Sequence, residues 1–454
     1  MLDAPIADQV SVHAARRLRG ELTLPGDKSI SHRALLLALL ADGESRITGA
    51  GDGRDVRATA GVASALGARI TRVGGDAHTR GARTVDYQVV SPGRTHLVEP
   101  ASILDCQNSG TTFRLVAGIL AGLPAFGILD GDESLRRRPM GRVAAPLRAM
   151  GAAIAGRADA TLAPFAITGS ASLRAIEHAS PVPSAQVKSC VLLAGLAATG
   201  TTIVRETLQT RDHTERMLRA RGVQVGTELL ADGSAIHTVA GPSTVRPLDE
   251  RVPGDVSGAA FWLVAAAIHP DANLLIRNVG TNPTRRGIID LLRRMGADIE
   301  ERPVGTGAGG ASGEPIADLA VRSSSLHGID VDPAEVAGAI DEIPILCVAA
   351  AVASGRSRIR GVGELRNKES DRVAGIVAGL AALGARVRAD GDVIEIEGGR
   401  ALRGVAVASH DDHRLAMAFA VAGLIAVGET LVGQAGAAEV SYPGFFDDLE
   451  RVRE

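Results

Sequence analysis

The chain has 454 residues, of which 45% are hydrophobic and 22% charged, and this is enough material for two large domains, each with its own core. Its formal net charge of -3 excludes a global positive field for nucleic acid, and an aromatic content of 2% leaves few rings on which bases could stack. The cysteines Cys106, Cys190 and Cys347 lie far apart, so we expect reduced, buried thiols rather than disulfides or a zinc site.

The N-terminal 19 residues carry Asp3 and Asp8 and have no continuous apolar core, so we expect no secretory signal. The longest apolar stretch, 415–427, is shorter than the roughly 20 residues needed to span a bilayer. It therefore predicts a core helix. Together, these two features predict a cytoplasmic protein without a membrane partner.

A first candidate site follows the Pro-Gly-Asp turn at 25–27. Lys28, Ser29 and Arg33 lie in or near the first turns of a predicted helix, where free N–H groups and the helix dipole favour an anion. The segment is not a Walker loop, because that motif requires Gly immediately before the Lys, and here Asp27 intervenes. A phosphate site is one interpretation, and an Asp-capped helix with solvated basic residues is the other.

Two further candidates precede predicted helices. Asn108 and Gly110 belong to the segment 105–114, whose small residues let a ligand approach the backbone and whose Asn, Ser and Thr side chains can cap a helix or bind a ligand. Arg138 closes a run of three arginines, and guanidinium groups bind carboxylate and phosphate through paired hydrogen bonds. For the other two arginines, a solvated charge run is the default interpretation.

Later segments also place polar side chains at the starts of predicted helices. Ser184 and Gln186 open a long apolar helix, and Arg211 precedes another; in isolation, either segment could be only a cap. Asp341 precedes a buried apolar run, where an acidic cap and a catalytic base are both possible interpretations.

Two features remain near the C-terminus. Lys368 and Arg372 are four residues apart and would share one face of a helix. His410 and His413 have an HxxH spacing, but no third ligand is evident nearby, so we expect no metal.

One pattern recurs along the chain: an apolar helical ending, a Gly, a small residue and a short β-like run. Gly fits the position just after a helix, where positive φ costs it little. The pattern predicts copies of one α/β unit, with a sixth copy expected near the end. The five clear copies contain Gly67, Gly151, Gly222, Gly296 and Gly384.

A second Pro-Gly-Asp at 253–255 matches the one at 25–27 and predicts two halves, joined by the polar stretch 242–255. The glycine-rich stretch 305–313 formally matches GxGxxG, but no good helix follows it. We therefore interpret it as a flexible surface loop rather than a dinucleotide site.

Taken in order, these segments resemble the 3-phosphoshikimate 1-carboxyvinyltransferase family, the EPSP synthases, across nearly the whole chain. The blocks that carry the resemblance are PGDKSISHRALLLALLADG, NSGTT, RRPMGRV, PSAQVKS, TRDHTERML, PGDVSGAAF, DEIPIL, LRNKESDR and DHRLAM. The resemblance implies an α/β (α+β) chain with the two-domain enolpyruvyl-transferase fold, inverse α/β barrel-like, made of six βαβαββ-like units. It implies one domain over 28–252 and a second from 1–27 plus 253–454, three units each, with crossovers near 25–28 and 246–255.

The resemblance also implies a reaction. The enolpyruvyl group of phosphoenolpyruvate would pass to the 5-hydroxyl of shikimate 3-phosphate, and phosphate would leave through a tetrahedral intermediate, without a metal or organic cofactor. The implied shikimate 3-phosphate ligands are Lys28, Ser29, Arg33, Ser184, Gln186, Arg211, Asp341 and Lys368. The implied phosphoenolpyruvate ligands are Lys28, Asn108, Gly110, Arg138, Gln186, Arg372 and Arg414. The implied catalytic residues are Asp341 as the base, Glu369 as the acid toward the enol methylene, and Lys28.

The chain departs from the family pattern near its end. Some members carry a Lys shortly before the Ser/Thr-aromatic-Pro motif, whereas here Glu439 and Val440 precede 441–443, so no ligand role is assigned there. Gly110 occupies a position that the family associates with glyphosate sensitivity, but the neighbouring loop also decides that property.

Two alternatives stay open. One is the sister enolpyruvyl transferase that acts on a UDP-sugar, whose reactive loop Cys has no matching context at Cys106. The other is a non-catalytic paralogue that only binds phosphorylated metabolites. For the main interpretation we expect a monomer with no nucleic-acid partner, acting in the shikimate pathway toward chorismate and aromatic amino acids.

Overall fold

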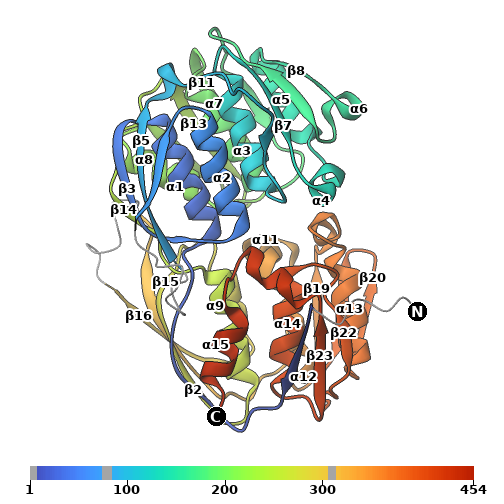
Figure 1. Ribbon diagram of the computed structural model, residues 1–454. Helices are drawn as coiled ribbons and strands as arrows, with labels where there is room; N and C mark the ends of the chain where they lie inside the picture. The colour runs from blue at the N-terminus through green and yellow to red at the C-terminus, as the bar shows by residue number, and fades with distance from the viewer. Residues whose placement is uncertain (1–7, 74–83, 305–312) are drawn as a thin grey trace. The chain divides into compact units, whose positions relative to one another are not determined.

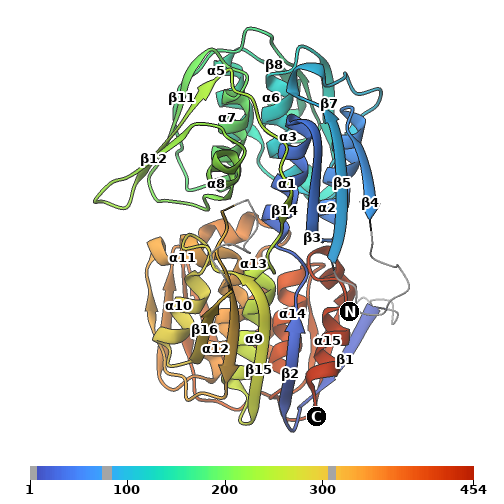
Figure 2. The same cartoon turned by 90° about the vertical axis from the view of Figure 1, so that its left-hand side faces the viewer.

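The computed structural model describes residues 8–73, 84–304 and 313–454, and most of the stretch 305–313 that we predicted as a loop lies outside them. The chain separates into two compact units (Figures 1 and 2). Unit 1 comprises Met1–Pro25, Pro253–Ala308 and Pro315–Glu454, and unit 2 comprises Gly26–Val252 and Gly309–Glu314. Each unit is described by itself below.

Unit 2 contains three of the six sheets found in the described residues. Their strands, in spatial order, are β14 (Glu250–Arg251), β3 (Asp42–Gly51), β5 (Thr84–Pro92) and β4 (Arg69–Val73); β6 (Leu104–Asp105), β7 (Phe126–Asp130), β9 (Phe165–Thr168) and β8 (Ala153–Gly156); and β10 (Glu177–Ala179), β11 (Gly200–Glu206), β13 (Ala235–Gly241) and β12 (Val225–Leu229). The helices are α1 (Lys28–Leu40), α2 (Arg54–Ala65), α3 (Gly110–Ala121), α4 (Glu133–Arg137), α5 (Gly141–Met150), α6 (Arg157–Ala160), α7 (Ala185–Gly195) and α8 (His213–Ala220).

Unit 1 contains the other three sheets. Their strands, in spatial order, are β16 (Asp298–Pro303), β17 (Ile316–Arg322), β15 (Ala272–Gly280) and β2 (Leu18–Thr23); β18 (Asp330–Val331), β19 (Arg356–Arg360), β21 (Val393–Glu397) and β20 (Arg386–Asp390); and β1 (Gln9–His13), β23 (Glu429–Gly433) and β22 (Ala406–Ala408). The helices, with the 3-10 turn η3 that contains Asp341 and the 3-10 turn η4 that precedes Lys368, are α9 (Val256–Ile268), α10 (Gly287–Arg294), α11 (Pro333–Ala339), η3 (Ile340–Glu342), α12 (Ile343–Val352), η4 (Gly363–Asn367), α13 (Arg372–Ala382), α14 (His413–Gly423) and α15 (Phe445–Val452).

The sheets repeat one topology. In the sheet of β6 to β9, an edge strand runs parallel to its neighbour, which pairs antiparallel with the next strand, which pairs antiparallel with the last. Chain order through this sheet is β6, α3, β7, α4, α5, β8, α6, β9, which is strand, helix, strand, helix, strand, strand with the short helices α4 and α6 added. The same pairing recurs in the other four-stranded sheets. The predicted α/β fold with repeated βαβαββ units is therefore confirmed, and the sixth copy has three strands among the described residues.

The glycines that identified the repeat lie where the sequence predicts, just after a helix. Each follows a helix and has a positive φ, between +80° and +113°, before a strand begins. An L side chain is strained in that region and Gly is not, so these positions end the helix at a defined point. The glycines are Gly67, Gly151, Gly222, Gly296 and Gly384.

In each unit, predicted site residues lie at the N-termini of buried helices. In unit 1, α9, α12 and α14 pack on one another and are buried along nearly their whole length, as expected for helices without a polar face. The core helix predicted over 415–427 is confirmed as α14, although the helix ends at Gly423. No helix in the described ranges combines the length and the apolar character needed to cross a membrane.

The two Pro-Gly-Asp segments also match in structure. The Asp27 side chain accepts a hydrogen bond from the Ile30 N–H (2.9 Å) at the start of α1. The Asp255 side chain accepts one from the Ser257 N–H (2.8 Å) at the start of α9. Both helices have 13 residues, and both aspartates are N-caps that satisfy an otherwise free backbone donor.

Candidate active site

The predicted residues at the start of α1 lie together. The Lys28 ammonium is 2.5 Å from a carboxylate oxygen of Asp55 on α2. The Arg211 guanidinium, from the segment before α8, donates to the Ser29 hydroxyl (3.4 Å). Because Asp27 also caps α1, the helix-cap interpretation and the clustering of cations hold at the same time. A helix N-terminus with two cations beside it favours a bound anion.

Arg33, one turn further along α1, is buried. Its guanidinium donates to the hydroxyls of Thr214 (2.7 Å) and Ser189 (2.9 Å) and to the backbone carbonyl of Ser29 (2.9 Å). Burial lowers the pKa of Arg33 to about 10, which still leaves the group charged at neutral pH. Arg33 thus joins α1 to α7 and α8 and adds a fixed positive charge to the cluster.

A second cluster surrounds Gly110, the first residue of α3. The Arg138 guanidinium donates to the Asn108 side-chain oxygen (2.6 Å) and backbone carbonyl (3.2 Å). A Cβ on Gly110 would lie 2.7 Å from Nη1 of Arg114 and 3.4 Å from Nη1 of Arg138. Ser109 is the N-cap of α3 and bonds the Thr112 N–H (3.1 Å). Glycine therefore leaves room for two guanidinium groups beside a helix N-terminus.

The other arginines of the run near Arg138 behave as the default interpretation predicts. Arg136 pairs with Asp130 and Arg137 with Glu133, and both arginines are exposed. Arg138, in contrast, is only 8% exposed. The structure therefore singles out one of the three arginines.

Gln186, at the start of α7, connects to the same cluster. Its side-chain oxygen accepts a hydrogen bond from Arg114, and its nitrogen donates to the Thr111 hydroxyl (2.9 Å). Ser184 is the N-cap of α7 and contacts the Val187 N–H at 3.4 Å. Arg114 was not among the predicted site residues; the available signal was its place one helical turn after Gly110.

A series of buried polar side chains links α1, α2 and α3 near their N-termini. The His32 Nδ1 atom is 2.6 Å from the Thr59 hydroxyl, which is 2.6 Å from the Thr112 hydroxyl. Burial, reinforced by the nearby Lys28 charge, lowers the pKa of His32 well below its usual value, so this imidazole is neutral. These hydrogen-bonded side chains hold the N-terminal parts of the three helices together within unit 2 and add no charge.

The predicted residues of unit 1 form a separate cluster around Arg372. The Arg372 guanidinium is 3.4 Å from Asp341, 2.6 Å from Glu369 and 2.8 Å from Asp412. Lys368 lies 3.3 Å from the same Asp341 oxygen. Burial alone would lower the pKa of Arg372, but the three carboxylates outweigh it and raise that pKa well above its ordinary value. Asp341 and Glu369, the two candidate carboxylates for proton transfer, are thus both paired with the buried Arg372.

The predicted placement of Lys368 and Arg372 on one helix is wrong. Lys368 follows η4, residues 368–370 form a bend, and α13 begins only at Arg372. The cause is Asp371, whose side chain accepts a hydrogen bond from the Ala374 N–H (2.9 Å) and starts the helix there. The two cations nevertheless contact one oxygen of Asp341.

Arg414 lies at the start of α14 and is 6% exposed. Its backbone N–H donates to Asp412 (2.8 Å), so Asp412 both caps α14 and pairs with Arg372. Of the HxxH pair, His410 is exposed and His413 buried. Among the residues that the structure describes, no group of three or more His, Cys, Asp or Glu side chains is placed to hold a metal.

The segment where the sequence departs from the family pattern has a local structural role. The Glu439 side chain accepts a hydrogen bond from the Gly444 N–H (3.1 Å), just before α15. We assign it no substrate contact.

All three cysteines are buried and none forms a disulfide, as predicted. Burial raises the pKa of the Cys106 thiol well above its usual value, helped by Asp105 and Asp130. A protonated, enclosed thiol is a poor nucleophile.

We therefore expect Cys106→Ser to retain most of the activity, measured as phosphate release at saturating substrates. We also expect Cys106 to resist alkylation by iodoacetamide in the folded protein. A loss of activity by orders of magnitude in a folded Cys106→Ser variant would contradict this.

Two sets of features define the class of protein. Unit 2 gathers buried cations at the N-termini of α1, α3 and α7, and unit 1 holds carboxylates around a buried arginine. Such residues suit an enzyme that acts on phosphorylated small molecules and moves protons.

The comparisons with known proteins give the family. The family model for EPSP synthase (3-phosphoshikimate 1-carboxyvinyltransferase) matches residues 12–449. A 3-phosphoshikimate 1-carboxyvinyltransferase of Gloeobacter violaceus is 51% identical over 98% of this chain and 99% of its own length, and one of Bacillus cereus is 46% identical over 96% and 97%. The solved structure of an EPSP synthase from Acinetobacter baumannii superposes with a TM-score of 0.84 at 38% identity, covering 98% of each chain. The chain belongs to the EPSP synthase family.

Proposed function

We propose that this chain transfers the 1-carboxyvinyl group of phosphoenolpyruvate to the 5-hydroxyl of shikimate 3-phosphate and releases phosphate. Family membership supports the reaction. The observation that carries the residue roles is the contact of Asp341 with Lys368 and Arg372, beside Glu369 on the same arginine. It places two carboxylates and two cations in one cluster, as proton transfer on an anionic substrate requires.

The chemistry needs opposite proton movements. The attacking hydroxyl must lose a proton while the methylene carbon of phosphoenolpyruvate gains one, and the tetrahedral adduct then expels phosphate. We assign Asp341 as the base for the hydroxyl and Glu369 as the acid toward the methylene. Lys28, 2.5 Å from Asp55, would balance charge on the reacting phosphate.

The anion-binding residues would hold the two substrates in a reactive arrangement. We assign Lys28, Ser29, Arg33 and Arg211 to shikimate 3-phosphate, because these residues cluster at the N-terminus of α1. Ser184, Gln186, Asp341 and Lys368 complete that proposed set. We assign the carboxylate and phosphate of phosphoenolpyruvate to the cluster around Gly110. From that cluster the proposed ligands are Asn108, Gly110, Arg138 and Gln186, and Lys28, Arg372 and Arg414 complete the proposed set. Fixing two reactants together can contribute up to roughly 7 to 11 kcal/mol in well-oriented systems.

The test is phosphate release from the purified full chain with phosphoenolpyruvate, with and without shikimate 3-phosphate, at physiological salt and without added metal. Release only with both substrates is the expected result. Release only with a UDP-sugar would replace the proposal by the sister transferase. No release from folded protein that still binds the substrates would indicate the non-catalytic paralogue.

Gly110→Ala should weaken phosphoenolpyruvate binding. The added Cβ would lie 2.7 Å from Nη1 of Arg114, so this guanidinium, which donates to Gln186, would have to shift. Overpacking of this kind should raise the KM for phosphoenolpyruvate about tenfold or more while the KM for shikimate 3-phosphate changes little. Gly61→Ala on α2, where a Cβ meets nothing within 4 Å, is the matched control. Equal KM values in both variants would remove Gly110 from the phosphoenolpyruvate site.

The setting of the reaction follows from the same proposal. We place the chain in the shikimate pathway, where its product leads to chorismate and the aromatic amino acids. We further propose that it works in the cytoplasm as a monomer on small-molecule substrates. Sedimentation at micromolar concentration tests the oligomeric state, and a dimer would contradict it.

A further inference from the structure

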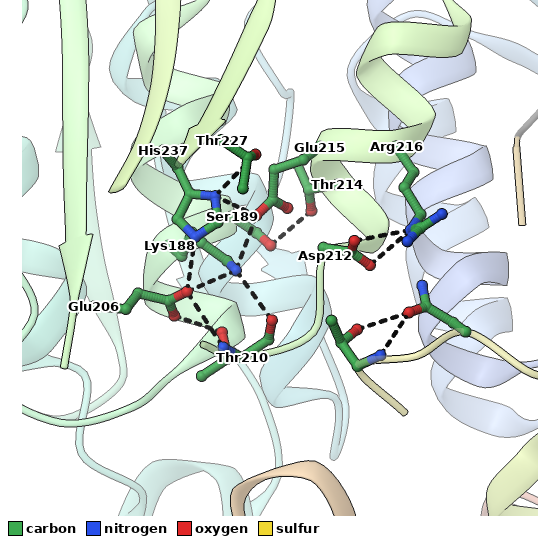
Figure 3. Close-up of polar contacts among 12 residues, drawn as sticks. Lys188, Ser189, Glu206, Thr210, Asp212, Thr214, Glu215, Arg216, Thr227 and His237 are labelled. Atoms are coloured by element: carbon green, nitrogen blue, oxygen red, sulfur yellow. Dashed lines mark hydrogen bonds and ion pairs between the residues drawn. The ribbon is translucent and has the colours of Figure 1, made fainter. Parts of the chain in front are cut away.

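Unit 2 contains a buried ionic cluster that the reaction itself does not require. It consists of Lys188 on α7, Glu206 at the end of β11, Glu215 on α8 and His237 on β13, and all four side chains are fully buried (Figure 3). The Lys188 ammonium is 2.8 Å from a carboxylate oxygen of each glutamate. The imidazole nitrogens of His237 are 3.0 Å from Glu206 and 3.1 Å from Glu215.

Lys188 and Glu206 both stay charged although they are buried. Burial alone would lower the pKa of Lys188, but Glu215 and Glu206 outweigh it and raise that pKa above its ordinary value. Burial alone would raise the pKa of Glu206, but His237 and Lys188 outweigh it and lower that pKa to about 2. Desolvating so many charges is costly, and apolar residues of similar volume often do as well for stability. The cluster therefore calls for a role other than stability.

The cluster holds the backbone immediately before Arg211. Glu206 accepts hydrogen bonds from both the hydroxyl and the N–H of Thr210, the latter at 3.3 Å, and Lys188 donates to the Thr210 carbonyl at 3.4 Å. Residues 207–212 belong to no helix or strand, so regular backbone pairing does not fix them. Every polar group of Thr210 thus bonds to the cluster (Figure 3). The next residue along the chain is Arg211.

The same cluster sets the surroundings of Arg33. Ser189 follows Lys188 on α7, and Thr214 precedes Glu215 on α8. Their hydroxyls are 2.7 Å apart, and each accepts a hydrogen bond from Arg33. Because the Lys188–Glu215 contact ties α7 to α8, it fixes the spacing of the two hydroxyls that orient Arg33.

We propose that the buried ionic cluster is a positioning device for Arg33 and Arg211, and so determines affinity for the phosphate of the acceptor substrate. Lys188, Glu206, Glu215 and His237 touch no substrate; they act through Thr210, Ser189 and Thr214. The inference rests on the proposed function, because it takes both arginines as ligands of shikimate 3-phosphate. It adds residues to which that function assigns no role.

The test is a double-mutant cycle on Thr210→Val and Arg211→Ala in the full chain. Valine keeps the shape of Thr210 and its backbone N–H, but its side chain cannot donate to Glu206. We expect Thr210→Val to raise the KM and calorimetric Kd for shikimate 3-phosphate about tenfold, with less than about a twofold change in the KM for phosphoenolpyruvate. In the Arg211→Ala background, adding Thr210→Val should change either constant by less than about twofold, because the residue it positions is gone.

Three variants make the result specific. Thr227→Val makes the same exchange at an exposed hydroxyl 3.3 Å from His237, on the side of the cluster away from Thr210, and should leave both KM values unchanged. Thr210→Ser restores the hydroxyl and should restore the low KM. Glu206→Gln removes the charge at the other end of the bond and should raise the KM for shikimate 3-phosphate in the same selective way.

The outcomes separate the two levels of the proposal. A wild-type chain that neither binds nor converts shikimate 3-phosphate overturns the proposed function itself. If the wild type is active, three results overturn only the positioning role: an unchanged KM in Thr210→Val, an equal rise in both KM values, or the same rise with and without Arg211.

Discussion

Replacing Asp341 with asparagine is expected to lower kcat by about 10² to 10⁴-fold, with the Kd for shikimate 3-phosphate changed by only a few-fold. The amide keeps the size of the carboxylate but cannot accept the hydroxyl proton. Asp341 lies on the short turn η3, in contact with Lys368 and Arg372, so its position is fixed by two cations rather than by a long helix. Steady-state phosphate release and calorimetry on the same preparation measure both quantities.

The matched control for that variant is Asp371→Asn. Asp371 is an exposed N-cap of α13 and bonds the Ala374 N–H, a role that asparagine fills equally well. It should leave kcat and the thermal midpoint of unfolding unchanged. If Asp341→Asn keeps kcat within about threefold of wild type, Asp341 is not the base.

The second large effect concerns a buried ion pair between Arg285 and Glu342, and Glu342 lies on the same turn, η3. Glu342, next to Asp341, accepts hydrogen bonds from Arg285 (3.2 Å to each oxygen) and from the Ser257 hydroxyl, and both ion-pair partners are almost fully buried. Arg285→Met leaves the Glu342 charge without its counterion. We expect it to destabilise unit 1 by about 3 to 5 kcal/mol.

Urea unfolding followed by tryptophan fluorescence measures this directly, because Trp262, the single tryptophan, is buried in α9 of unit 1. Arg302→Met removes an exposed ion pair with Glu300 and should cost less than about 1 kcal/mol. The double variant Arg285→Met/Glu342→Leu should recover most of the loss, since an apolar pair needs no counterion. A single Arg285→Met variant as stable as wild type would show that the pair contributes little.

The repeated fold could be predicted because its signals are local. A glycine just after a helix and an aspartate just before one each act within a few residues, and the structure has both where the sequence places them. The error at Lys368 and Arg372 has the same origin. Spacing alone predicted one helix, whereas the side chain of Asp371 caps α13, which begins at Arg372, four residues after Lys368.

The site residues that could not be predicted from the sequence are those whose partners are distant in the sequence. Asp55 pairs with Lys28, and Asp412 pairs with Arg372 from the start of another helix, although the sequence analysis gave neither aspartate a role in the site. Arg33 bonds to Ser189, which is 156 positions away. Residue patterns carry no information about such pairings until the fold brings the helix entrances together.

The strand pairing of unit 1 has a consequence for synthesis of the chain. Strand β1 pairs with β23, and the Ser11 hydroxyl bonds to Glu429, 418 positions later. On a ribosome that adds about 5 to 20 residues per second, β1 waits at least roughly 20 seconds for its neighbour. Residues 26–252 of unit 2 are all made well before that moment. Folding during translation should therefore finish in the middle of the polypeptide first, while its earliest strand remains unpaired and open to chaperones.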